Sequence, residues 1–363
     1  MNPFFVTGLY RSGTTLLEKL IAADLSVALF SQPCAPLFFH AKNKIHTKLG
    51  LKNRQPLDPS FPDPGYSWKE LYGLLESEIF TQEDLKEVFT DIRNYSGILT
   101  SEVQQLQGKI AEGNFLAVFS QVLTLLNEQQ KPYAGSKEIL CEEFTPYFIS
   151  HGIKSIIIVR DPRDMICSLN FGRGAEFTGL IRPLLYSLRL WRKSIAFSIL
   201  NAPSPDFKML RYEDLVSDRQ GVMDEVFLFL GLRPGSGIEL PDSWKGNSSF
   251  GDLETVSESS LGNYKRMLDA KTISYIENVC RPEMNWAGYE LENSHLRVES
   301  IRSYQEPFKV NHRNFDPGYS SDIINLQEEM VRIRLLREKT IRPEEQVSYF
   351  LFPEVYHTLK DSY

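Results

Sequence analysis

A glycine-rich loop near the N-terminus, GLYRSGTT, has the residue types and spacing of a phosphate-binding loop. Such a loop follows the pattern G-x-x-x-x-G-K-S/T between a strand and a helix, and its backbone N–H groups bind phosphate. Gly8, Gly13 and Thr15 keep this register, whereas Thr14 replaces the lysine and Arg11 supplies a cation. ATP chemistry would be poorly served without that lysine. The loop therefore predicts a donor with a single 5′-phosphate that ends in a further anionic group.

Two later segments place polar side chains directly after strand-like apolar runs. Arg160 follows the run IIIV, and Ser168 lies one to two helical turns further on. Together they offer a charged hydrogen-bond donor and a hydroxyl to a second phosphate. Tyr212 follows another such run and offers a flat face or a hydroxyl near a base. One nucleotide with phosphates at both ends of its ribose would satisfy all three sites.

Strand-like and helix-like segments alternate around these residues. The apolar runs at 4–6, 156–159 and 207–210 suit buried strands, and helix-like sequence follows each of them. Such alternation favours a parallel sheet, in which ligands bind at the carboxyl ends of the strands. The sequence therefore predicts an α/β fold of the P-loop type, a three-layer sandwich with a central parallel sheet.

Local signals also predict where several elements begin and end. Thr14 or Thr15 is expected to cap the first helix, and a second strand is expected over residues 27–33. A helix that opens in the sequence DAKTISYIENVC is expected to stop near Pro282, because proline lacks the N–H group that continues a helix.

Residues 41–130 are less regular and are expected to form a helical insertion over the edge of the sheet. One helix is expected to start at Thr81, which acids follow in the first turn, and another to cover residues 115–130. The insertion is either plain structural helix or a lid that shapes the pocket of the acceptor.

The chain becomes more polar beyond Leu291, and residues 293–363 are expected to form a C-terminal helical extension. An amphipathic helix is predicted over about 321–338, with Ser320 or Ser321 as its cap. Its apolar face must be covered, so the extension is expected to pack on its own domain or on a second chain, as in a homodimer.

The composition restricts the class of protein. The formal net charge is −7, so nothing in the overall charge favours nucleic acid. No apolar run reaches the roughly 18 residues of a membrane span, and the first strand starts too close to Met1 for a signal peptide. A cytoplasmic protein is therefore expected. Widely spaced cysteines predict buried thiols and no zinc site; they are Cys34, Cys141, Cys167 and Cys280.

Taken together, the motifs resemble those of the PAPS-dependent sulfotransferases, PAPS being 3′-phosphoadenosine 5′-phosphosulfate. YRSGTTLLEKL resembles the family's 5′-phosphosulfate loop, VRDPRDMICSL its 3′-phosphate motif, and LRYEDLV a segment near the adenine. The stretch from SLGNYKRML to WAGYEL resembles the family's closing region. The resemblance covers roughly residues 1–35 and 134–292, and it implies a sulfotransferase domain over residues 1–292.

The resemblance also implies roles for single residues. Arg11 would contact the 5′-phosphosulfate and offset charge as the sulfuryl group leaves, and Lys137 would lie near the acceptor and the sulfate. Many cytosolic members carry Arg-Lys-Gly near the closing region, where this chain has Ser257, Glu258 and Ser259. Ser257 and Lys265 are expected to compensate for that departure. The donor-binding residues implied are Arg11, Ser12, Gly13, Thr14, Thr15, Arg160, Ser168, Tyr212, Ser257 and Lys265.

The catalytic base of the family is missing from both of its usual positions. Cytosolic members place a histidine two residues after the lysine, where this chain has Ile139. The protein-tyrosine branch uses a glutamate after the second strand, where this chain has Gln32. A base helps such a reaction by about 10²–10⁴-fold. The remaining candidates are Glu138, His40, Glu142 and Glu143.

The sequence thus predicts an enzyme that moves a sulfuryl group from PAPS to a hydroxyl, or as second choice an amine, of a small-molecule, lipid or carbohydrate acceptor. Adenosine 3′,5′-bisphosphate would be released, and no metal is expected because arginine and lysine can supply the charge. A P-loop kinase is one alternative and would show magnesium-dependent ATP turnover. A non-catalytic nucleotide-binding protein is the other, and it would bind PAPS without transferring anything.

Overall fold

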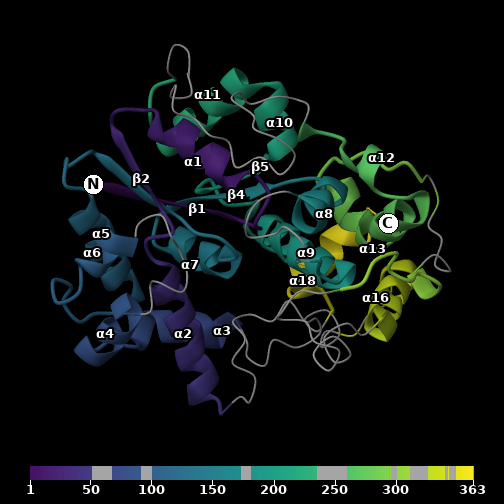
Figure 1. The fold of residues 1–363 in the computed structure, drawn as a ribbon. Helices are drawn as coiled ribbons and strands as arrows, with labels where there is room; N and C mark the ends of the chain where they lie inside the picture. Colours follow the sequence, from purple (N-terminus) through teal and green to yellow (C-terminus); the bar gives the residue numbers. More distant parts are fainter. Residues whose placement is uncertain are drawn as a thin grey trace.

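Five parallel strands form the central sheet in the order β2-β3-β1-β4-β5 (Figure 1). The predicted α/β fold with a central parallel sheet is thereby confirmed. All five strands end at the same edge, so the segments that follow them come together there. The strands are β1 (Asn2–Gly8), β2 (Val27–Ser31), β3 (Tyr133–Lys137), β4 (Lys154–Val159) and β5 (Phe207–Arg211).

The structure of the chain is a computed structural model. It describes residues 1–50, 68–90, 100–172, 181–234, 260–293, 295, 301–310, 326–339, 342 and 349–362. The helices are α1 (Thr14–Ala22), α2 (Ala35–Lys48), α3 (Trp68–Ser77), α4 (Gln82–Thr90), α5 (Thr100–Gln104), α6 (Phe115–Leu126), the 3₁₀ helix η2 (Glu142–Phe144), α7 (Thr145–Ser150), α8 (Pro162–Phe171), α9 (Leu184–Asn201), α10 (Tyr212–Ser217), α11 (Arg219–Leu230), α12 (Tyr264–Met267), α13 (Ala270–Trp286), α16 (Leu326–Glu338) and α18 (Pro353–Leu359).

Alternate residues of β1 face two different cores, one on each side of the sheet. Phe4 and Val6 pack with apolar residues of α1, α10 and α11, whereas Phe5 packs with residues of α2, α6, α7 and α9. In Figure 1, α1, α10 and α11 cover one face of the sheet and α7 and α9 lie over the other. The three-layer sandwich follows from this period of two along a fully buried strand.

Three predicted boundaries are wrong. Gly13, with a φ of 99°, precedes α1 and no side chain caps that helix, so neither predicted threonine is the cap. The strand β2 ends at Ser31, because the φ of Gln32 is 53° and turns the chain. The helix α13 continues through Pro282. Cys280 and Met284 on either side of it are fully buried, so packing outweighs the lost hydrogen bond.

The helices α2 to α6 pack on one another, and α6 also contacts β3. The predicted helix start at Thr81 is confirmed, because the Thr81 N–H donates to Asp84 Oδ2 and the Asp84 N–H donates to Thr81 Oγ1. The helix predicted from residue 115 is α6, and the Asn114 side chain caps it. Helical structure begins at Ala35, which is earlier than the predicted insertion at 41–130.

The C-terminal helix α16 contacts α9 and α13 of the same chain through buried ion pairs. Glu329 accepts from Arg189 Nε at 2.8 Å and from Arg192 Nη2 at 2.8 Å, and Arg332 pairs with Glu283. The helix lies near the predicted range of 321–338, and the predicted caps Ser320 and Ser321 lie outside the described residues. The division of the chain into parts 1–292 and 293–363 stays a prediction.

Two general expectations also bear on the fold. All four cysteines are free and buried, as predicted. Within the described residues, no helix is long and apolar enough to span a bilayer.

Candidate active site

The loop between β1 and α1 turns sharply at two left-handed residues. Arg11 has a φ of 66° and Gly13 a φ of 99°. The Ser12 hydroxyl donates to the Leu9 carbonyl and closes the loop on itself. A Cβ atom at Gly13 would lie 2.3 Å from Cδ2 of Tyr212, so only glycine fits. The loop thus leads into the N-terminus of α1, where backbone N–H groups and the helix dipole favour an anion.

The two phosphate motifs of the sequence meet in space. Arg11 Nε donates to Ser168 Oγ at 2.8 Å, and Arg160 Nη1 donates to the Arg11 carbonyl at 3.3 Å. Arg160 follows β4 directly, and Ser168 lies on α8, which begins two residues later. Two guanidinium groups and a hydroxyl therefore converge beside the N-terminal loop, as an arrangement that binds two anions requires.

The closing segment lies over Arg160 and Tyr212. The Arg160 guanidinium carbon is 4.6 Å from the centre of the Tyr212 ring, and Nη2 donates to the Ser260 carbonyl at 2.7 Å. The hydroxyls of Tyr212 and Ser260 are 2.9 Å apart. Lys265 is exposed on α12, and Ser257 lies outside the described residues. The structure thus brings Tyr212 to the predicted nucleotide site, where its ring packs on protein groups.

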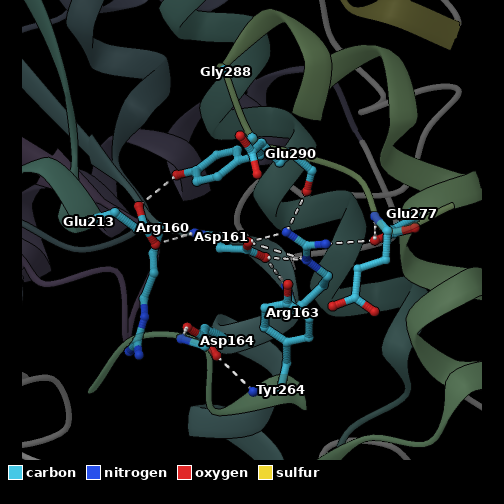
Figure 2. Close-up of polar contacts among 12 residues, drawn as sticks. Arg160, Asp161, Arg163, Asp164, Glu213, Tyr264, Glu277, Gly288 and Glu290 are labelled. Carbon is cyan, nitrogen blue, oxygen red and sulfur yellow. Dashed lines mark hydrogen bonds and ion pairs between the residues drawn. The ribbon is translucent and has the colours of Figure 1, made fainter. Parts of the chain in front are cut away.

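A buried network fixes the turn that carries Arg160 (Figure 2). The Arg163 guanidinium donates to Asp161, to Glu277 Oε1 at 2.6 Å and to the Glu290 carbonyl at 2.8 Å. The Asp161 N–H in turn donates to Glu213 Oε1 at 2.9 Å. These contacts join the end of β4 to α10, α13 and the segment after α13, so Arg160 sits on a rigid support.

Two further contacts position the same region and have no clear signal in the sequence. Trp191 Nε1, from α9, donates to the Arg160 carbonyl at 2.7 Å. Asp164 accepts from the backbone N–H groups of Gly262 and Tyr264 and so anchors the closing segment to α8 (Figure 2). Asp164 belongs to the matched motif VRDPRD, but no pattern indicates that it reaches a segment about 100 residues away.

Lys137 ends β3, next to the strand that leads into the loop, and its side chain is buried. It is 1% exposed, and its Nζ lies 3.0 Å from Glu18 Oε2 on α1. A solvated surface lysine is therefore excluded. Glu18 was not predicted as a site residue, although an acid between Leu17 and Ile21 on the buried side of an amphipathic helix is a signal of a buried ion pair.

Glu138 follows Lys137 directly and is fully buried. Its Oε1 accepts from the Cys34 N–H at 2.8 Å and from the Ser136 hydroxyl, and Oε2 has no hydrogen-bond partner among the described residues. Burial raises the pKa of Glu138 to about 7, against the opposing effect of those two hydrogen bonds. A carboxyl with such a pKa is suited to accept a proton near neutral pH.

The other candidate bases have partners that tie them to structural contacts. His40 Nε2 lies 2.9 Å from Asp84 Oδ1, which joins α2 to α4. Glu143 pairs with Lys193 at 3.0 Å and with Lys42, whereas Glu142 pairs with Lys193 at 3.2 Å. Burial alone would raise the pKa of Glu143, but the two lysines lower it. All three side chains are thus held in structural ion pairs or hydrogen bonds, which favours Glu138 among the candidates.

The two positions at which family members carry a base, Gln32 and Ile139 here, both lie next to the end of β3. The Gln32 N–H donates to the Lys137 carbonyl at 2.7 Å, and Ile139 follows Glu138. In the part of the chain that the structure describes, no group of three or more histidine, cysteine or acidic side chains is placed to hold a metal ion.

Comparison with known families identifies the class. Residues 2–309 match the model of the sulfotransferase domain family. The chain therefore belongs to this family of enzymes, and the predicted resemblance and enzyme class are confirmed. The match with a sulfotransferase model disfavours the P-loop kinase alternative.

Several solved structures are similar to this chain. The sulfotransferase domain from the curacin biosynthetic pathway is 18% identical, with a TM-score of 0.44 over 80% of this chain and 99% of that domain. The sulfotransferase domain from the Synechococcus PCC 7002 olefin synthase is 19% identical, with a TM-score of 0.40 over 84% and 96%. Sulfotransferase STF9 from Mycobacterium avium is 13% identical, with a TM-score of 0.38 over 80% and 78%. Comparison with curated protein sequences gives no significant match.

Proposed function

We propose that the protein transfers the sulfuryl group of PAPS to a hydroxyl, or as second choice an amine, of a small-molecule, lipid or carbohydrate acceptor, and releases adenosine 3′,5′-bisphosphate. One observation supports this most strongly. In a member of the sulfotransferase domain family, Arg11, Ser168 and Arg160 converge at the carboxyl edge of the sheet through contacts of 2.8 and 3.3 Å.

In the proposed complex, the loop residues and the N-terminus of α1 bind the 5′-phosphate, and Arg160 and Ser168 bind the 3′-phosphate. Ser168 Oγ and Arg160 Nη2 at present contact Arg11 and the Ser260 carbonyl. In the complex, phosphate oxygens would take the place of the Arg11 guanidinium beside Ser168 and of the Ser260 carbonyl beside Arg160. The exchange is favourable because hydrogen bonds from guanidinium groups to phosphate are stronger than those to neutral acceptors.

The proposed reaction is a single in-line displacement at sulfur. The acceptor oxygen forms a bond to sulfur while the bond between sulfur and the 5′-phosphate oxygen breaks, and the acceptor proton passes to Glu138 Oε2. Negative charge grows on the 5′-phosphate as the sulfuryl group leaves. Arg11 and Lys137 are the cations that would stabilise this charge, and such stabilisation is typically the largest contribution to catalysis.

The acceptor pocket is proposed to lie between β3 and the helices that follow β2. The Cys34 N–H at the start of α2 is bonded to Glu138, so the proposed base and the first insertion helix share a contact. This supports a role for that region in shaping the pocket, beyond plain structural helix. A mass-spectrometric screen of hydroxyl-bearing and amine-bearing compounds with PAPS would identify the acceptor class.

Adenosine 3′,5′-bisphosphate should raise the melting temperature much more than AMP or ATP does, with no magnesium present. A ligand that binds only the folded state raises the free energy of unfolding by RT ln(1 + [L]/Kd), which is about 2.7 kcal/mol at a ligand concentration of 100 times Kd. The 3′-phosphate is what AMP and ATP lack, so Arg160→Ala should remove most of the difference. Thermal unfolding with each nucleotide measures this. Equal shifts from ATP and the bisphosphate would contradict the assignment of PAPS as donor.

The rate of sulfuryl transfer should fall as the pH drops below about 7. The pKa of Glu138 is about 7, so the carboxylate that accepts the proton is lost on acidification, by about tenfold per pH unit well below the pKa. Glu138→Gln should be slow and should lack this acidic limb. Turnover of PAPS against pH, with water or an identified hydroxyl acceptor, is the measurement.

The control for this pH profile is Glu213→Gln. Burial also raises the pKa of Glu213 to about 7, and its carboxylate accepts from the Asp161 N–H and the Tyr289 hydroxyl. It supports the binding region and is not proposed to accept a proton. The acidic limb should therefore persist in Glu213→Gln. An acidic limb that persists in Glu138→Gln would exclude Glu138 as the base.

A further inference from the structure

The ion pair between Glu18 and Lys137 is buried beside the donor loop. Glu18 is 5% exposed and Lys137 is 1% exposed, and Oε2 and Nζ are 3.0 Å apart. The other oxygen of Glu18, Oε1, is 3.8 Å from Nζ of the exposed Lys19. A buried ammonium is costly unless a carboxylate compensates its charge, so Glu18 is what allows a charged lysine at this position.

The two members of the pair come from the elements that frame the loop. Lys137 is paired in register with Val6, two residues before the loop begins at Gly8. Glu18 lies one helical turn after Thr14, the first residue of the helix that the loop enters. The pair therefore joins β3 to α1 beside the loop, and it fixes the lysine relative to both the strand and the helix N-terminus.

We propose that Glu18 is a positioning residue for sulfuryl transfer, which holds the Lys137 ammonium where it meets the charge that develops on the departing group. This rests on the proposed function. In the resting protein the ammonium is neutralised by Glu18, and the bound donor offers it a second anionic partner. Because Glu18 holds the Lys137 ammonium in a fixed position, the attraction between the ammonium and the donor strengthens only as negative charge grows in the transition state.

The test is a double-mutant cycle of Glu18→Gln and Lys137→Met, with PAPS as donor and water as the probe acceptor. Glu18→Gln should lower the rate at saturating PAPS by about 10- to 100-fold. The Kd of adenosine 3′,5′-bisphosphate should stay within about twofold, since only the transition state loses an interaction. In the Lys137→Met background the same change should cause no further loss of rate, because Glu18 acts through the lysine.

Thermal unfolding checks that each variant is folded. Glu18→Asp keeps the charge if Glu18→Gln proves unstable, and it draws the carboxylate back by one methylene group, so its rate should lie between wild type and Lys137→Met. The matched control is Glu225→Gln, in an exposed pair with Lys208 on the surface of α11 and β5, which should react like wild type.

Three outcomes would overturn the inference. A wild-type rate for both Glu18→Gln and Glu18→Asp would show that the pair is structural only. A further loss of rate in the Lys137→Met background would show that Glu18 acts independently of the lysine. Failure of the wild-type protein to bind the bisphosphate would overturn the proposed function as well, so the two failures are distinguishable.

Discussion

Arg11→Ala should weaken the binding of adenosine 3′,5′-bisphosphate and lower the turnover of PAPS, whereas Lys137→Met should lower turnover alone. Arg11 lies in the loop and its side chain reaches Ser168 of the second motif, so it is proposed to contact the donor at both ends. Lys137 is held by Glu18 at 3.0 Å and acts mainly on the sulfuryl group in flight.

The expected loss of turnover is about 10²–10³-fold for either variant, as is typical when one charged group that stabilises a transition state is removed. Bisphosphate affinity, measured by calorimetry, and turnover of PAPS should be determined side by side. Methionine is chosen at position 137 because it fills the buried volume without the charge. Arg233→Ala removes an exposed arginine three residues after the end of α11 and serves as the control.

Each variant has a result that would contradict the assignment. Normal turnover in Lys137→Met would mean that the buried lysine serves only to pair with Glu18, and that the resemblance of Lys137 to the family's lysine is coincidental. Normal binding and turnover in Arg11→Ala would mean that the loop is not a donor site, which would remove the main support for the proposed reaction.

Glu329→Gln should lower the free energy of unfolding by about 3–5 kcal/mol, the range for breaking a buried ion pair. Glu329 on α16 is buried and is the shared partner of Arg189 and Arg192 on α9. Burial alone would raise its pKa, but Arg192 and Arg189 hold the pKa well below the usual range. The variant would leave the buried Arg189 and Arg192 without their shared carboxylate. Chemical denaturation of the variant and the wild type measures the difference in the free energy of unfolding.

The adjacent Glu328 provides a matched control. Its Oε2 lies 3.2 Å from Arg189, but the side chain is 27% exposed, and ion pairs near the surface contribute about 0–1 kcal/mol. Glu328→Gln should therefore be nearly neutral. Equal stability of the two variants would contradict the proposal that α16 docks on its own domain, and would leave docking on a second chain as the alternative.

The local sequence was sufficient to predict the alternation of strands and helices and the loop that joins the first pair. A short continuous apolar run such as 156–159 favours a buried strand. A glycine is required at position 13 because the φ of this residue is 99°. Polar residues directly after two strands predicted Arg160 and Tyr212 as neighbours, since parallel strands end at one edge. These signals lie within a few residues of one another, so the chain itself carries them.

Helix α9 shows where the local pattern fails. It is buried over nearly its whole length and carries Arg189, Arg192 and Lys193, so its hydrophobic periodicity is weak. Each of these charges pairs with an acid that is distant in the sequence, among them Glu329 and Glu143. A buried charge is permitted only by its partner, and the sequence does not reveal which partner that is.

The sequence by itself determined the fold class, the family and the segments that form the donor site. The tertiary structure decided which side chains act together: Arg11 with Ser168, Lys137 with Glu18, and Glu138 with the N–H group that opens α2. It also distinguished Glu138 from the other candidate bases. The physical reason is that strand and helix formation depends on neighbouring residues, whereas burial, pKa and ion pairing depend on groups that only the folded chain brings together.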